Sequence, residues 1–99
     1  MTIATPRSDL SSPLCAALAH EIRDVRALVE TLSTVFLTDH ALALRFVAEL
    51  QAIDLIVQRA DESARLLDRI AAGDCQDRAV DAVRLEDMQA RLRVRLKGV

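Results

Sequence analysis

The chain has 99 residues, of which 52% are hydrophobic, and a formal net charge of -2. A chain of this length forms one domain, and its charge balance gives no general reason to expect nucleic acid or an anionic membrane as a partner. It contains two glycines, two prolines, and no tyrosine or tryptophan. A composition so poor in turn formers and so rich in alanine, leucine and valine predicts an all-α fold.

Neither a membrane span nor a secretory signal is visible in the sequence. The uncharged run 31–38, and also the longer run 10–20, are far shorter than the roughly 20 residues that a spanning helix needs. The N-terminus lacks a cationic start followed by an apolar segment. The two cysteines, Cys15 and Cys75, do not make a disulfide framework, and we expect both as reduced thiols. These features are typical of a soluble cytoplasmic protein.

Residues 1–11 show no apolar periodicity, and we expect them to form a flexible tail. Ser12-Pro13 then resembles a helix N-cap followed by proline at the first helical position. The spacing of apolar residues predicts a helix over about 13–37. Its apolar stripe consists of Leu18, Ile22, Val25, Val29, Leu32 and Phe36.

A second and longer helix is predicted over about 40–72. Asp39 can cap its free amides, and Gly73 is suited to a left-handed C-cap. Its apolar residues recur at spacings of three and four, at 43, 46, 50, 53, 57, 60, 64, 67 and 71. This pattern is the seam of a helix that packs on other helices. The short connection at 38–39 forces the two helices into an antiparallel hairpin over 12–73.

The second helix carries further apolar residues, Leu42, Ile56 and Ile70, beside this seam. Its apolar face is therefore wider than one partner helix covers. Two hairpins that pair into a four-helix bundle would cover it, so we expect a homodimer.

The C-terminal part begins with a polar linker, expected over 74–84, with room for one helical turn. A short amphipathic helix is predicted over 85–97, with Leu85, Met88, Leu92 and Leu96 on its apolar side. Two interpretations of this helix remain open. It packs back on the hairpin, or it lays its apolar side into a groove of a partner protein.

Most kinds of catalytic or metal site find no support in the sequence. His20, in His20-Glu21-Ile22-Arg23, resembles the phospho-accepting motif of sensor kinases, but the proline of that motif and an ATP-binding domain are absent. Surface positions are favoured for His20 and for His40. No metal-ligand spacing and no glycine-rich phosphate loop occur, so we expect no cofactor bound by this chain alone.

Asp54 and Gln58 form the most informative polar pair. They lie four residues apart and off the seam, so their side chains share one exposed face of the helix. Gln51 and Asp61 extend the same polar row. Leu55 is predicted to be exposed between Asp54 and Gln58, which is unusual for a solvated face and typical of one that meets another protein.

The segment Asp54-Leu55-Ile56-Val57-Gln58, preceded by Leu50-Gln51, resembles the active helix of the chemotaxis phosphatase family CheZ. It is also similar to the small CheT-type proteins of bacterial chemotaxis operons. The resemblance covers the hairpin in architecture and only this segment in sequence. This chain is shorter than the classical phosphatase, and its spacing between Gln51 and Asp54 differs.

The resemblance implies an enzyme that dephosphorylates a phosphorylated CheY-like response regulator. Gln58 would orient the attacking water, Asp54 would pair with the regulator's lysine, and the regulator would supply Mg²⁺. The same resemblance implies that the C-terminal helix, with Leu85, Met88 and Leu92, docks on a partner. Two other hypotheses remain open: a non-enzymatic dimeric helical adaptor, and histidine phosphotransfer through His20.

Overall fold

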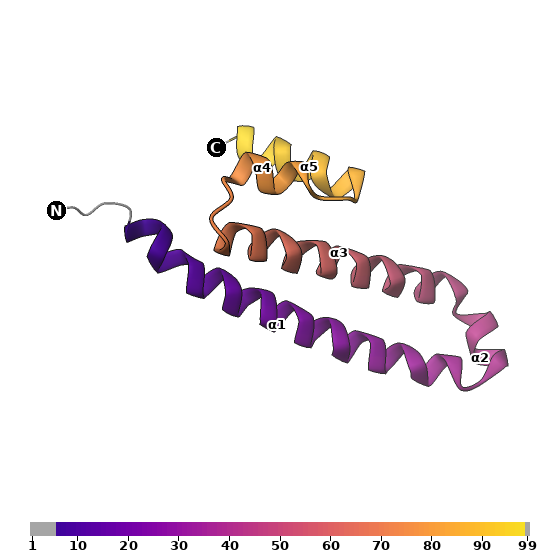
Figure 1. Ribbon diagram of the computed structural model, residues 1–99. Helices are drawn as coiled ribbons and strands as arrows, with labels where there is room; N and C mark the ends of the chain where they lie inside the picture. The colour runs from indigo at the N-terminus through magenta and orange to yellow at the C-terminus, as the bar shows by residue number, and fades with distance from the viewer. Residues whose placement is uncertain (1–5, 99) are drawn as a thin grey trace.

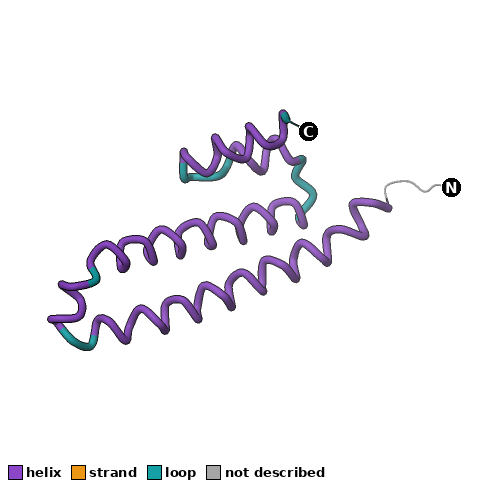
Figure 2. The backbone as a smooth tube through the Cα atoms, turned by 180° about the vertical axis from the view of Figure 1, so that it is seen from behind, coloured by secondary structure: helices purple, strands orange, loops and turns teal. Residues whose placement is uncertain are grey.

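The computed structural model describes residues 6–98, with side chains described for residues 12–98, and over that range it contains helices joined by turns and no strand. The helices are α1 (Pro6–Leu37), α2 (His40–Arg45), α3 (Val47–Ala71), α4 (Gln76–Asp81) and α5 (Glu86–Lys97). Helices α1 and α3 pack side by side as an antiparallel hairpin, with α2 at the turn (Figure 1). Helices α4 and α5 lie on the side of α3 away from α1 (Figure 2). The predicted all-α fold is confirmed.

Helix α1 begins earlier than predicted. It starts at Pro6, where the missing N–H of proline costs nothing, and Pro13 lies inside it. Pro13 removes a single backbone hydrogen bond, and the helix continues through it. The predicted N-cap at Ser12-Pro13 is therefore wrong, as is the predicted tail over 6–11. Residues 1–5, the rest of the expected tail, lie outside the described residues.

The predicted second helix is divided at Phe46, whose φ of -112° and ψ of 33° are not helical. The break separates α2 from α3, so the prediction of one helix over 40–72 is wrong at this point. The Phe46 ring packs edge-to-face on Phe36, with the ring centroids 5.4 Å apart. The Arg45 guanidinium lies over the Phe46 ring, 5.6 Å from its centroid. The helical periodicity of 40–72 thus gives way at Phe46, where aromatic packing closes the hairpin turn.

Both predicted caps of this segment are confirmed. The Asp39 carboxylate accepts hydrogen bonds from the backbone N–H of Ala41 and of Leu42. At the other end, Gly73 has a φ of +104°. The Gly73 N–H donates to the carbonyl of Ile70, and the Asp74 N–H donates to that of Arg69, which together form a Schellman motif.

The predicted apolar seam of the second helix is also confirmed, whereas only three of the six residues of the predicted α1 stripe are half-buried. All nine predicted seam positions from 43 to 71 are buried or half-buried. On α1, Ile22, Val29 and Phe36 are half-buried, but Leu18, Val25 and Leu32 are exposed. One partner helix covers one narrow seam, so the remaining apolar residues of α1 are left beside it.

The segment 74–84 is not the predicted linker. It contains α4, and Ala79, Val80 and Val83 are buried. Met88 of α5 is also buried, at 7% exposure. These apolar residues form a second packed layer on α3, so the C-terminal helix packs back on the hairpin.

We predict that Gly73→Ala lowers the free energy of unfolding by about 1–2 kcal/mol, because a Cβ disfavours positive φ. No atom lies within 4 Å of the added Cβ, so the cost is conformational and not steric. Urea unfolding at fixed protein concentration measures it. Gly98→Ala is the matched control, since Gly98 has a helical φ of -73°. Equal effects at both positions would contradict the assignment.

Candidate functional site

Asp54 and Gln58 are both exposed in the middle of α3, as predicted. They lie one helical turn apart, about 6 Å along the axis, and Gln51 is exposed one turn before them. Within residues 12–98, the Asp54 and Gln58 side chains have no hydrogen bond or ion pair to the rest of the chain. Their polar atoms are therefore free to bind a group from outside the chain.

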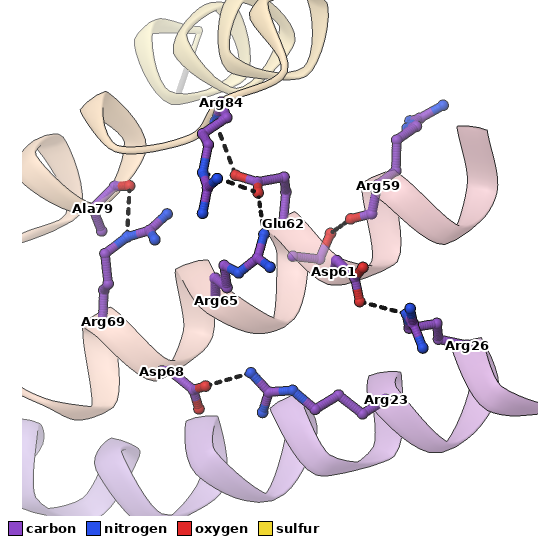
Figure 3. Close-up of polar contacts among 11 residues, drawn as sticks. Arg23, Arg26, Arg59, Asp61, Glu62, Arg65, Asp68, Arg69, Ala79 and Arg84 are labelled. Carbon is purple, nitrogen blue, oxygen red and sulfur yellow. Dashed lines mark hydrogen bonds and ion pairs between the residues drawn. The ribbon is translucent and has the colours of Figure 1, made fainter. Parts of the chain in front are cut away.

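Asp61 does not extend this free polar row. Its Oδ1 lies 2.6 Å from Nε of Arg26 on α1, and its side chain is 30% exposed. A second ion pair of 2.6 Å joins Arg23 of α1 to Asp68 of α3 (Figure 3). Asp61 thus joins the two helices of the hairpin, and its role in binding a partner stays a prediction.

Leu55 lies at the edge of a shallow cavity between α3 and the start of α5. Its side chain is 50% exposed. The cavity has a volume of about 270 Å³ and is lined by Leu55, Arg59, Leu85, Glu86, Asp87, Met88 and Arg91. The fold therefore gathers Leu55, Leu85 and Met88, which were predicted from separate segments, around one hollow.

A neighbouring cavity of about 300 Å³ continues along α5 and is lined by Arg59, Ser63, Met88, Arg91, Leu92 and Arg95. The two cavities share Arg59, Met88 and Arg91, and we call them together the α3–α5 groove. Its lining combines three arginines and two carboxylates, Glu86 and Asp87, with apolar side chains. Met88 is buried and Leu92 is half-buried in this lining, so both are packed within the chain and are not on a free docking arm.

Glu62, which sequence reasoning missed, holds α4 and α5 against α3. Its Oε1 accepts a hydrogen bond of 2.8 Å from the backbone N–H of Arg84, and its Oε2 accepts one of 2.7 Å from Nη1 of Arg65 (Figure 3). The Glu62 side chain is 5% exposed. The sequence did contain a signal for this role of Glu62. It lies seven residues after Leu55 and four before Leu66, and this spacing places all three on one side of α3.

Further hydrogen bonds fix the same layer. Nε of Arg69 donates to the carbonyl of Ala79 over 3.3 Å. Nε2 of Gln89 lies within hydrogen-bonding distance of the carbonyls of Val80, Asp81 and Val83. These bonds satisfy the carbonyls at the end of α4 and set the position of α5. The shape of the α3–α5 groove depends on them.

The other candidate residues are dispersed. His20 and His40 are exposed on different helices, Cys15 is half-buried and Cys75 is exposed, and both cysteines are free thiols. Among the described residues, no group of three or more histidines, cysteines or carboxylates is placed to hold a metal ion. No helix of residues 6–98 has the length and apolarity to cross a bilayer.

Comparison with known proteins gives no relative. The chain matches no known protein family, no curated protein sequence and no solved structure.

Glu62 predicts a specific dependence of stability on pH. Burial raises the pKa of Glu62, but the Arg84 N–H and the guanidinium groups of Arg65 and Arg84 outweigh it and lower the pKa below the ordinary value of 4.5. The ionised form is therefore favoured by folding. Its contribution to stability is present above pH 4.5 and is lost as the pH falls through the lowered pKa.

We expect Glu62→Gln to lower the free energy of unfolding by about 1–2 kcal/mol at neutral pH, since it weakens hydrogen bonds to a charged group. The difference from wild type should shrink below pH 4.5. Urea unfolding at a series of pH values measures both effects. Glu49→Gln, at an exposed position of the same helix, is the control. A difference that stays constant down to low pH would contradict the role of the Glu62 carboxylate.

Proposed function

We propose that this chain is a phosphatase that dephosphorylates a phospho-aspartyl, CheY-like response regulator of bacterial chemotaxis or two-component signalling, in the cytoplasm. Gln58 orients the attacking water, and Asp54 pairs with the regulator's lysine. The regulator supplies the Mg²⁺ that its aspartyl phosphate requires. The proposal combines the resemblance of the segment from Leu50 to Gln58 to the active helix of CheZ with the placement of that segment in the fold.

One observation carries the proposal: Asp54 and Gln58 project unpaired and exposed from the middle of a 25-residue helix. Helix α3 packs on α1 on one side and lies beside α4 and α5 on the other, so it holds Asp54 and Gln58 in a fixed relation. Catalysis that depends on inserting a side chain into a partner's site requires both projection and rigidity. The pair meets both requirements.

The chemistry suits the two residue types. A glutamine amide donates and accepts hydrogen bonds and carries no charge, so it aligns water without repelling the phosphoryl group. Phosphoryl transfer responds mainly to alignment and to stabilisation of charge, which a positioned amide and the regulator's metal and lysine supply together. The carboxylate of Asp54 gives a charged contact that sets the register of the complex.

The α3–α5 groove supports a protein partner beside the pair. Leu55 lies three residues before Gln58 and borders the groove, so a partner that contacts Gln58 has an apolar anchor point close by. The groove is lined by three arginines, Arg59, Arg91 and Arg95, and by two carboxylates, Glu86 and Asp87, and this small excess of positive charge favours an acidic surface. The same groove supports the second candidate function, a non-enzymatic adaptor, in which the partner binds here without catalysis.

The proposal predicts that Gln58→Ala slows catalysed phosphate release from a phosphorylated, Mg²⁺-loaded regulator by about 100-fold, as loss of one positioned polar group does elsewhere. The measurement is phosphate release with wild type and variant side by side. Gln76→Ala, at an exposed position of α4, is the matched control and should keep full activity. Equal acceleration of phosphate release by wild type and by Gln58→Ala would contradict the catalytic role of Gln58.

Leu55→Arg separates binding from catalysis. We expect it to weaken the complex with the regulator by about 10-fold or more, because a charge replaces the apolar contact at the edge of the groove. Titration of a labelled regulator measures the affinity, and Gln58→Ala should leave that affinity nearly unchanged. If a regulator binds and Leu55→Arg abolishes binding, while wild type releases no phosphate, the adaptor function replaces the phosphatase.

A further inference from the structure

Helix α1 exposes a row of large apolar side chains along one flank. Between 43% and 67% of each is accessible, and their spacing is that of a coiled-coil heptad with Glu21 at the one charged position. We call this row the outer seam; its apolar members are Leu14, Leu18, Val25, Leu28, Leu32 and Val35. Each lies one residue before the positions of α1 that face α3. The outer seam therefore runs beside the intramolecular contact for its whole length.

The outer seam lies on the flank of the hairpin opposite the ion pairs. Successive residues of a helix are rotated by about 100°, so Val25 points about 200° away from Arg23, which pairs with α3. Ile56 of α3 lies two residues from both Asp54 and Gln58 and points away from both in the same manner. Ile56 is itself 50% exposed. The hairpin thus has a charged flank, which carries the candidate site, and an apolar flank.

We infer that the apolar flank is covered by a second copy of this chain, with the outer seam of one copy packed on the outer seam of the other. A single chain buries only a small apolar core. Within residues 12–98, the buried apolar residues include three alanines, and no large side chain is fully buried.

The size of the outer seam suits a second copy of the chain. Six apolar side chains exposed to this extent offer on the order of 600 Å², close to the roughly 800 Å² that each partner buries in a stable interface. A two-fold interface pairs a surface with itself, so two seams of equal length and heptad spacing match end to end. An antiparallel arrangement also keeps the two Glu21 carboxylates from facing each other.

This interface leaves the candidate site accessible in both copies. Asp54 and Gln58 lie on the charged flank, away from the contact, so each copy could engage a partner independently. The inference rests on the outer seam and not on the proposed function, and it stands whether the protein is an enzyme or an adaptor.

The test is the mass in solution, measured by light scattering after size exclusion over a range of concentrations. We expect wild type to have twice the 10.9 kDa mass of one chain. Val25→Glu should raise the dimer dissociation constant about 30-fold or more, because it places a charge in the apolar contact. Val94→Glu introduces the same change at an exposed valine of α5, outside the seam, and should leave the dimer intact.

A second measurement covers the case in which Val25→Glu does not fold. In a background with Cys15→Ser and Cys75→Ser, a short bis-maleimide should cross-link Val25→Cys into covalent dimers and leave Val94→Cys monomeric. The melting temperature of wild type should also rise with protein concentration. Wild type that stays monomeric at every concentration, or equal cross-linking of the two cysteine variants, overturns the inference.

Discussion

The limited width of a helix–helix contact governs the architecture of this protein. One helix packed on another buries a single seam, and here α1 presents half-buried residues such as Cys15, Ile22 and Phe36 to α3. Apolar residues one position away, such as Leu18 and Val25, are left at the surface. The edge-to-face packing of Phe36 and Phe46 closes one end of this contact, and two ion pairs follow one flank. The hairpin acquires two chemically different flanks as a consequence.

The second layer depends on a buried carboxylate. Glu62 accepts hydrogen bonds from the Arg84 backbone and the Arg65 side chain, and so connects the chain between α4 and α5 to the middle of α3. A buried charge is tolerated only where partners satisfy it, and these contacts satisfy both oxygens. With this layer in place, α3 is held on two sides, and the α3–α5 groove forms beside its exposed polar pair.

The division of α3 into faces explains how one helix serves several purposes. The seam from Leu50 to Ala71 faces α1, the side with Leu55 and Glu62 faces the C-terminal layer, and Asp54 and Gln58 project between them. The proposed phosphatase activity depends on Asp54 and Gln58, and the inferred dimer depends on the apolar flank on the opposite side of the hairpin. Because these surfaces are separate, substitutions in one are expected to leave the other functional.

The sequence alone determined the features that depend on neighbouring residues: the helical class, the cap at Asp39, the left-handed turn at Gly73, the α3 seam and the exposure of Asp54 and Gln58. These follow from backbone propensity and from periodicity within one helix. Tertiary structure decided the rest. It extended α1 through Pro13, broke the second helix at Phe46, recruited Asp61 into an ion pair, and turned the expected linker into a packed layer with Met88 beneath it. Contacts between distant segments decide these features, and the spacing of residues within one segment contains no information about which distant segment will pack against it.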